Sequence, residues 1–430
     1  MRCTGSCVLT EGYTAATLRQ RHPSTASILN VACSMTNQRH GARRTALASI
    51  AIILGSACIV KESDSSKKAA TDTAAQQPAR AAVADTDISV PAYDSASLDT
   101  AGLGSQTDSL AEVSGDSGFK HITRKTADVP LTRFPARIPS SGPLPLQLEV
   151  FLDRASFSPG IIDGNWGKNA MKALMWFRIA NGMDSSGTAS IEKTTYDMLV
   201  AAAQSTSATT TYQITAEDVK GPFATIPNLV YSQAKLKCLC YSSPAEAISE
   251  RFHVSRNLLA QLNPKASLDN LAAGASLVVP NVRDPTAASP TDTVIVARLI
   301  VSKQGFWTHA IDATGRIVYH FPSTLGAGYD PSPTGDFKVT DVSRDPAFHY
   351  QPKLFAEVPD TKPEAHLPPG PNSPVGVVWI ALSKPHYGIH GTASPETIGY
   401  ANSHGCVRLT NWDALKLAEV VEPGTPVQFQ

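Results

Sequence analysis

The spacing of hydrophobic residues changes near residue 292, and this change limits the folds open to the chain. Before that point, apolar residues recur at i, i+3, i+4 and i+7, as from Leu148 to Ala155, which is typical of amphipathic helices. After it, short apolar runs at residues 294–301 and 375–382 are separated by Gly and Pro, which indicates strands. One core does not usually serve both patterns over 430 residues. The sequence therefore predicts a multidomain α+β protein.

The charge balance argues against a protein that binds nucleic acid. Lys and Arg total 37 and Asp and Glu total 37, so the chain as a whole has no basic field to attract phosphates. Hydrophobic residues make up 42% of the chain, which is enough for several cores. A set of folded domains that act on something other than nucleic acid is expected.

Residues 1–57 are interpreted as a leader that contains a signal peptide. The apolar run at residues 46–54 is too short for the ~20 residues that span a bilayer, and it follows Arg43 and Arg44 as a secretory signal does. Met35 leaves open that residues 1–34 are a mis-called start. Cys58 is either a lipid acceptor that tethers the chain to a membrane or simply follows the cleavage site. We expect export to the periplasm or cell envelope of a bacterium.

The segments after the leader alternate between low-complexity and compact sequence. Residues 58–142 predict a disordered tether, because they are rich in Ala, Ser, Thr and Asp and poor in aromatics. Residues 143–204 predict a small three-helix bundle, with its third helix capped by Ser190. The turn of this bundle at residues 162–167 resembles that of the helical peptidoglycan-binding domain. Residues 205–234, rich in Ser, Thr and Ala, predict a linker.

Residues 235–282 predict a small βααβ module, with helices at 244–252 and 255–262 and a closing strand at 276–279. Together with residues 262–264, this pattern resembles a LysM module. Whether the module binds glycan stays open, because the Gly-Asp turn of that family is absent. Cys238 and Cys240 are either a metal-binding CxC pair or a partly buried pair, since joining them would close a strained ring.

Residues 292–430 predict a mainly β domain that contains the residues suited to catalysis. His390 and Cys406 lie sixteen residues apart, and each precedes or follows a glycine, Gly391 or Gly405. A free thiol with a pKa of ~8.5 is only a few per cent thiolate at neutral pH, so a nearby imidazole is expected to lower that pKa by ~2 units. The glycines are expected to let backbone approach a substrate, and N–H groups near Cys406 to face an oxyanion. This apparatus predicts acyl transfer.

Residues 374–379 and 403–413 resemble the catalytic domain of the L,D-transpeptidases, the YkuD family, within a similarity that covers about residues 292–430. The resemblance implies a YkuD-like β-sandwich in which Cys406 attacks the third-residue carbonyl of a peptidoglycan tetrapeptide stem and releases D-Ala. His390 would be the general base, with its ring oriented by the backbone carbonyl of Gly391. Backbone N–H groups of His404, Gly405 and Cys406 would form the oxyanion hole.

The resemblance implies peptidoglycan stem peptides and glycan as partners, and it implies no cofactor. The acyl group would pass to an amine of another stem or of a wall-anchored lipoprotein. The alternatives are hydrolysis, which would make the protein an L,D-carboxypeptidase, and a non-catalytic wall-binding scaffold. Residues 292 onward alone are expected to keep turnover on soluble muropeptides.

Three further side chains, Arg408, Tyr387 and Ser403, are candidates for substrate binding. Arg408 is expected either to bind a stem carboxylate or to pair with a local acid. Ser403 is expected either to bind substrate or to form a hydrogen bond with the loop backbone. His404 is favoured as a structural residue. The loops at residues 350–355 and 367–372 are expected to roof the cleft. A zinc site is the chemical rival, with ligands from His386, His390, His404 and Cys406.

Overall fold

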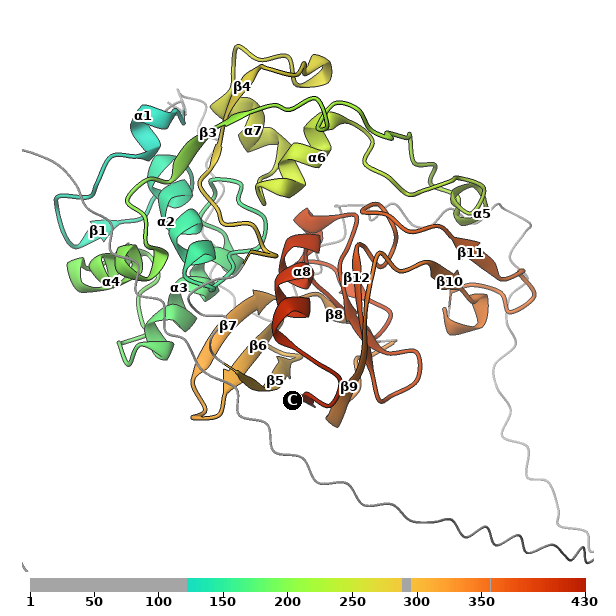
Figure 1. Cartoon of the computed structure of the whole chain (residues 1–430). Coiled ribbons are helices and arrows are strands. Elements are labelled where there is room, and N and C mark those ends of the chain that lie inside the picture. Colours follow the sequence, from blue (N-terminus) through green and yellow to red (C-terminus); the bar gives the residue numbers. More distant parts are fainter. Residues whose placement is uncertain (1–121, 288–294, 329, 356) are drawn as a thin grey trace, which may run out of the picture. The chain divides into compact units, whose positions relative to one another are not determined.

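The computed structural model describes residues 122–287, 295–328, 330–355 and 357–430. The predicted leader and residues 58–121 of the predicted tether lie outside these residues. Figure 1 shows a helical part, coloured cyan to yellow, and a β-rich part, coloured orange to red. None of the helices formed by the described residues combines the length and the apolar character needed to cross a bilayer.

Three helices form where the helical periodicity predicts them. They are α2 (Pro143–Arg154), α3 (Lys168–Ala180) and α4 (Lys193–Ala203). The third begins later than expected, with Glu192 as its N-cap. Ser190 is not a cap, because β2 (Ser190–Ile191) pairs with β1 (Ala136–Arg137) in an antiparallel ladder.

The end of the predicted tether is packed rather than extended. A short helix, α1 (Arg124–Ala127), forms within it, and Ile122, Ala127 and Ile138 are buried. The side-chain amide of Gln147 on α2 donates to the carbonyl of Ala127 at 3.1 Å. The composition of this stretch indicates a polar segment, but its few apolar residues pack in the same core as those of α2.

The βααβ pattern is present, with its first strand in an unexpected place. Helices α6 (Pro244–Arg251) and α7 (Arg256–Leu262) and strand β4 (Ser276–Pro280) follow the prediction. The partner of β4 is β3 (Thr209–Gln213), within the predicted linker, and no strand forms at residues 235–240. The β-branched threonines of β3 favour a strand, whereas the Ser, Thr and Ala composition of the segment had indicated a linker.

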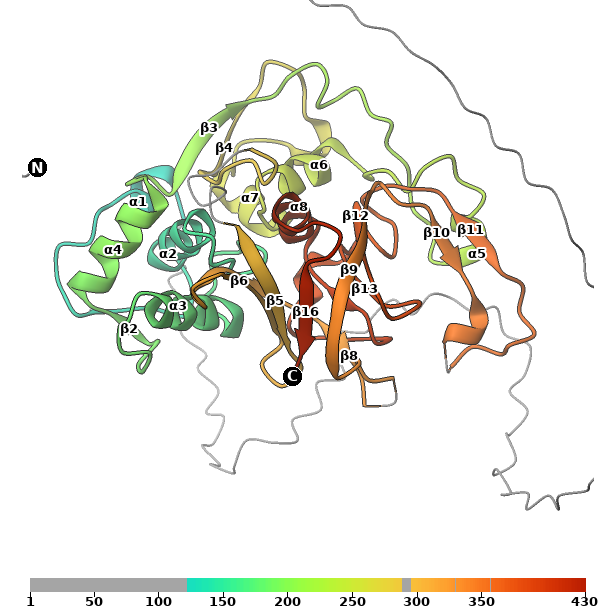
Figure 2. The ribbon, with the colours of Figure 1, turned by 60° about the horizontal axis from the view of Figure 1, so that its bottom comes forward.

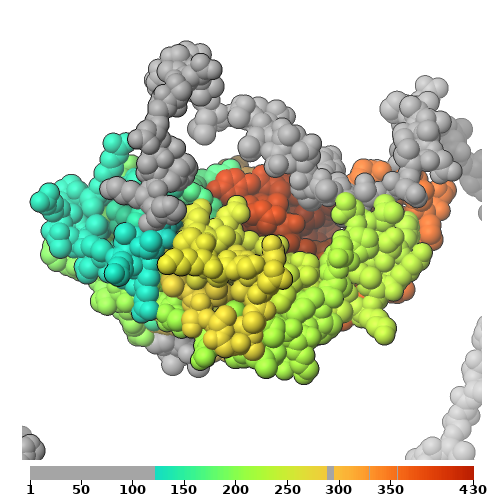
Figure 3. All heavy atoms as spheres, turned by 90° about the horizontal axis from the view of Figure 1, so that it is seen from above, coloured from blue at the N-terminus to red at the C-terminus, as the bar shows by residue number. Residues whose placement is uncertain are grey.

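The helical part has one continuous core. Buried side chains from Ile122 to Val279 form a single cluster, so the two modules that the sequence predicts share their interior. Figure 3 shows the yellow surface of this part directly beside the cyan surface.

The β-rich part is built on one curled sheet of eight strands rather than on the two packed sheets of a sandwich (Figure 2). The strand order is β15-β13-β12-β9-β16-β5-β6-β7. The strands are β5 (Val296–Ser302), β6 (Trp307–Asp312), β7 (Ile317–Pro322), β9 (Gly335–Arg344), β12 (Val378–Leu382), β13 (Gly388–His390), β15 (Val407–Arg408) and β16 (Pro426–Phe429). The helix α8 (Asn411–Val420) contacts β12 and β13, and its apolar residues share the core of the sheet.

Smaller elements complete the β-rich part and its connections. Among the described residues, two further two-stranded sheets and several short helical turns belong to this group. They are β8 (Leu325–Gly326) with β14 (Asn402–Ser403), β10 (Phe348–Tyr350) with β11 (Ala365–Leu367), α5 (Val230–Gln233), and the turns at Leu268–Asn270, Pro352–Leu354 and Pro395–Thr397.

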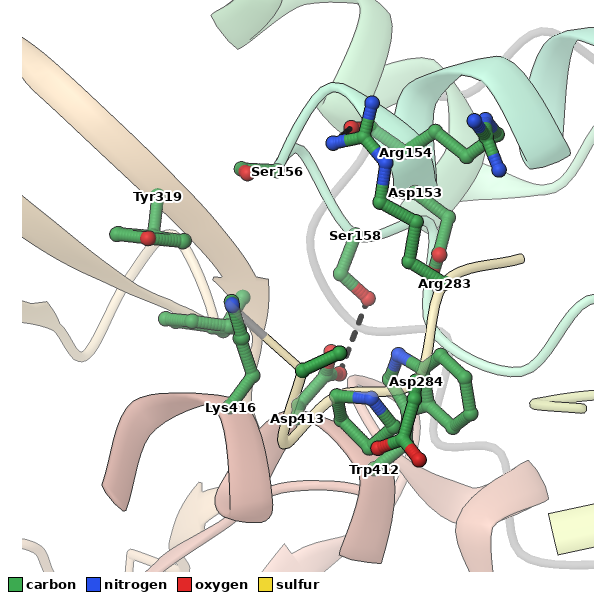
Figure 4. Close-up of a pocket in the computed structure, with 13 residues that line it drawn as sticks. Asp153, Arg154, Ser156, Ser158, Arg283, Asp284, Tyr319, Trp412, Asp413 and Lys416 are labelled. Carbon is green, nitrogen blue, oxygen red and sulfur yellow. Dashed lines mark hydrogen bonds between the residues drawn. The ribbon is translucent and has the colours of Figure 1, made fainter. Parts of the chain in front are cut away.

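The helical part holds α8 through buried polar contacts. In Figure 4, Ser158 from the loop after α2 points toward Asp413 of α8. Its hydroxyl donates to the Asp413 carboxyl at 3.0 Å, and burial raises the pKa of that carboxyl to about 6. The ring of His253 stacks on Trp412 with centroids 5.1 Å apart, and its imidazole contacts Asp153 at 2.8 Å. The N-terminal turn of α8 is therefore fixed from outside the β-rich part.

Candidate active site

Two short parallel strands bring His390 and Cys406 to one cavity. In β13 and β15, Ile389 pairs with Val407 and His390 pairs with Arg408. Ile389 and Val407 are fully buried in the core of the sheet, so the alternation of side chains directs His390, Arg408 and the preceding Cys406 to the other face. All three line a cavity of about 380 Å³. The pairing of β13 with β15 therefore brings together two residues that lie sixteen positions apart in the sequence.

The imidazole of His390 is held in one orientation by the backbone. Its Nδ1 lies 2.7 Å from the carbonyl oxygen of Gly391, and since a carbonyl only accepts, Nδ1 carries the proton and Nε2 keeps its lone pair. The ring stacks on Trp379 with centroids 5.4 Å apart. Burial, followed by the charge of Arg408, lowers the pKa of His390 to about 3. The ring is therefore a neutral base with a free acceptor nitrogen, oriented as the resemblance implies.

The surroundings of Cys406 favour the thiol over the thiolate at neutral pH. Burial raises its pKa to about 11, and the backbone N–H of Gly388 and the charge of Arg408 offset only part of this effect. Its Sγ donates to the carbonyl of His386 at 3.6 Å. The expectation that the imidazole lowers the thiol pKa is wrong for this state, because a neutral ring supplies no positive field. The pair is a thiol and an imidazole rather than two ions.

The loop at residues 403–406 has its carbonyl groups engaged. The hydroxyl of Ser403 donates to the carbonyl of Cys406 at 2.5 Å, so Ser403 bonds the loop backbone as one interpretation holds. The hydroxyl of Ser332 donates to the carbonyl of Gly405 at 2.8 Å. In the described part of the chain, no acceptor takes the N–H groups of Gly405 and Cys406. These two donors remain available to a ligand.

The glycines beside the site serve packing more than substrate approach. A Cβ on Gly391 would lie 2.1 Å from Oδ1 of Asn411, so a larger residue does not fit there. Gly405 has φ +93°, and a Cβ there would lie 2.8 Å from the ring of Tyr387. Tyr387 is outside the lining of the cavity and covers the Gly405 backbone instead.

Asn411 is a buried residue that the sequence analysis did not single out. Its Oδ1 accepts from the backbone N–H of Thr392 at 3.1 Å and of Val377 at 3.3 Å. Its Nδ2 donates to both oxygens of Glu250 and to the carbonyl of Pro371, each at 3.1 Å. The residue thereby holds the peptide group that contains the Gly391 carbonyl, which orients His390, and ties it to the segment at Val377. Asn411 lies at the start of α8, inside the stretch that resembles the YkuD family, and this position is the one feature of the sequence that could have indicated its role.

Some of the remaining predicted residues line the cavity, and others contact the residues that line it. Nε2 of His404 lies 2.6 Å from Oε1 of Glu357, and the ring lies 5.0 Å from that of Phe355. The loop at residues 350–355 lines the cavity as expected, whereas that at 367–372 does not. The lining also includes residues that were not predicted: Val230, Phe348, His349, Glu357, Val358 and Trp379.

The described residues offer no set of side chains for either of the metal sites considered from the sequence. Among the described residues, no three His, Cys, Asp or Glu side chains come together as metal ligands. Cys238 and Cys240 are joined in a disulfide, the pairing that the sequence analysis considered strained. Cys406 is the free cysteine of the described residues.

Comparisons with known proteins agree on one family. A model of the YkuD L,D-transpeptidase catalytic domain matches residues 297–429. A putative L,D-transpeptidase YkuD of Bacillus licheniformis is 35% identical over 184 residues, which cover 43% of this chain and 92% of that protein. Its namesake in Bacillus subtilis is 31% identical over 181 residues, which cover 42% of this chain and 90% of that protein. The solved L,D-transpeptidase of Xylanimonas cellulosilytica is 16% identical with a TM-score of 0.30, covering 70% of this chain and 100% of that one, a likeness too weak to carry an argument.

Proposed function

The chain belongs to the YkuD family of L,D-transpeptidases, cysteine acyltransferases that act on peptidoglycan stem peptides, and on this premise we propose that Cys406 and His390 perform its chemistry. One observation carries the proposal. A free thiol and a neutral imidazole with an unprotonated Nε2 line the same cavity, His390 at the end of β13 and Cys406 directly before the adjacent strand β15. This is the arrangement of a nucleophile with its general base.

In the first half of the reaction, the enzyme takes the acyl group from a tetrapeptide stem. Nε2 of His390 accepts the thiol proton as Sγ of Cys406 bonds to the carbonyl carbon of the third residue. The oxyanion receives hydrogen bonds from the N–H groups of Gly405 and Cys406, with that of His404 as the third candidate donor. The amide bond then breaks, His390 returns the proton to the leaving amine, and D-Ala departs from a thioester.

In the second half, an amine takes the acyl group. His390 accepts a proton from the attacking amine, the C–S bond breaks, and the thiol of Cys406 is restored. The amine belongs to another stem or to a wall-anchored lipoprotein, and water in its place gives the carboxypeptidase reaction. Arg408, which lines the cavity, is the proposed partner of a stem carboxylate.

The parts before residue 292 are proposed to bring the enzyme to its polymer. The resemblance of residues 143–204 to a peptidoglycan-binding unit and of residues 235–282 to a LysM module supports binding to the wall. Two linked weak sites raise avidity by ~10² to 10⁴ when both engage the polymer. An exported protein of the cell envelope, with or without a lipid on Cys58, fits this role.

The test is mass spectrometry of muropeptides after incubation with a tetrapeptide stem. The protein is expected to release D-Ala and form a cross-linked dimer, whereas a tripeptide product would identify hydrolysis. Cys406→Ala should abolish release, and His390→Gln should reduce kcat by about 10² to 10⁴. Both variants should unfold at the temperature of the parent chain. Release of D-Ala by Cys406→Ala would refute the assignment of the nucleophile.

A further inference from the structure

A loop outside the residues that match the family model contributes Val230 to the lining of the catalytic cavity. Residues 224–241, which we call the strap, lie between β3 and α6, and the backbone N–H of Ala224 donates to the carbonyl of Tyr241 at 3.0 Å. The family match begins at residue 297, so the strap is not part of it. A compact loop with paired ends is often functional.

The strap supplies the core of the β10–β11 hairpin. Val230 and Leu239 of the strap are buried in a cluster with Tyr350, Ala365 and Leu367 of the hairpin. This cluster is separate from the core of the eight-stranded sheet. A two-stranded hairpin alone is marginally stable in water, so the hairpin needs the strap to hold its shape.

The disulfide of the strap presents Leu239 to the β-rich part. The N–H of Leu239 donates to the carbonyl of Pro369 at 3.0 Å, and its carbonyl accepts from the N–H of Asn372 at 2.9 Å. Cys238 and Cys240 flank this residue and are joined to each other. Both backbone groups at the centre of the closed turn are therefore used in docking.

The docked strap and hairpin form the apolar wall of the cavity. The residues of this wall are Val230, Phe348, Tyr350, Leu354, Phe355 and Val358. Glu357, from the loop between the hairpin strands, also contacts His404 two residues before the nucleophile. The strap thus reaches the cavity directly through Val230 and indirectly through the hairpin.

We propose that the strap completes the donor-binding cleft and that Val230 is a specificity-determining residue for the acyl-donor stem. The inference rests on the proposed function. The attacked carbonyl belongs to the third residue of the stem, so the side chain of that residue lies in the cavity beside Cys406. The aliphatic part of that side chain packs on the apolar wall, and Val230 sets the space left for it.

The test measures kcat and KM for a soluble tetrapeptide stem with the full chain carrying Val230→Ala. We expect the loss of one CH₂ contact with the substrate to raise KM about fourfold, while kcat stays within twofold. Lys235→Ala, at an exposed position of the same loop, is the matched control and should leave both constants unchanged. Thermal unfolding and alkylation of Cys406 by iodoacetamide check that each variant is intact.

A second variant tests the docking of the strap without touching the cavity. Cys238→Ser with Cys240→Ser should raise KM by a similar factor, and the parent chain treated with a phosphine reductant should behave like this variant. Parent kinetics in both the alanine variant and the serine variant would overturn the inference while leaving the transpeptidase intact. A parent chain that releases no D-Ala would instead refute the proposed function, and the inference with it.

Discussion

At the scale of single residues, the site depends on which proton each group holds before substrate arrives. Burial raises the pKa of Cys406 to about 11, and burial with the Arg408 charge lowers that of His390 to about 3. Between these values the thiol keeps its proton and the imidazole is neutral. The thiolate then forms only as His390 accepts the proton during attack, so little free thiolate is expected in the resting enzyme at neutral pH.

Alkylation of Cys406 by iodoacetamide should therefore depend steeply on pH. A pKa of about 11 leaves about 0.1% thiolate at pH 8, and the rate should rise about tenfold per pH unit from pH 7 to 10 without a plateau. The measurement is the mass of the labelled chain over time, with Cys406→Ala as the blank. A plateau reached between pH 5 and 7 would indicate a thiolate–imidazolium pair and contradict this picture.

At the scale of elements, Asn411 joins α6, α8 and the Gly391 loop. It receives two backbone N–H groups near the site and donates to Glu250 of α6. Glu250 is partly buried, and desolvation raises its pKa to about 7. A buried amide with all its partners satisfied rigidifies what it binds, here the carbonyl that sets the ring of His390.

Asn411→Asp should weaken this junction by about 3 kcal/mol, because it removes the donors and sets a second carboxyl against Glu250. We also expect kcat to fall about tenfold as the Gly391 carbonyl loses its support. Adding Glu250→Gln supplies an amide donor and should restore more than half of both losses. Urea unfolding and turnover of the parent chain, of each single variant (Asn411→Asp and Glu250→Gln) and of the double variant measure the coupling. Strictly additive effects would show that the two residues act separately.

At the scale of the whole described chain, the catalytic domain is not self-contained. Residues before 288 supply Ser158 to Asp413, Glu250 to Asn411 and the strap to the hairpin. Trp176 of α3 also packs edge-on against Trp307, with centroids 5.1 Å apart. Removing these residues leaves buried polar groups without partners and exposes apolar surface.

A fragment of residues 292–430 is therefore expected to lose turnover on soluble muropeptides by tenfold or more and to unfold at a lower temperature than residues 122–430. This changes the expectation from the sequence that the isolated domain keeps its activity. Turnover and thermal unfolding of the two fragments, compared side by side, provide the check. Equal kcat/KM in both would show that the contacts across residue 288 are dispensable.

The sequence alone determined the local elements and the identity of the reacting groups. Helices α2, α3, α6 and α7 follow from apolar periodicity, and the strands from short apolar runs bounded by Gly and Pro, because these patterns depend on neighbours in the chain. The motif around Cys406, with His390 upstream, indicated the family, because the reaction requires a thiol and an imidazole and both can be recognised from the residue types.

The completion of the cavity and the charge state of its groups depend on how distant segments of the chain pack together. The pairing of β3 with β4, the docking of the strap, and the contact of Glu250 with Asn411 join segments more than thirty residues apart, which no local pattern encodes. The pKa of Cys406 moved opposite to the expectation because desolvation depends on everything packed around the sulfur. Burial and long-range contact are properties of the packed chain, and they decide where the reaction can occur.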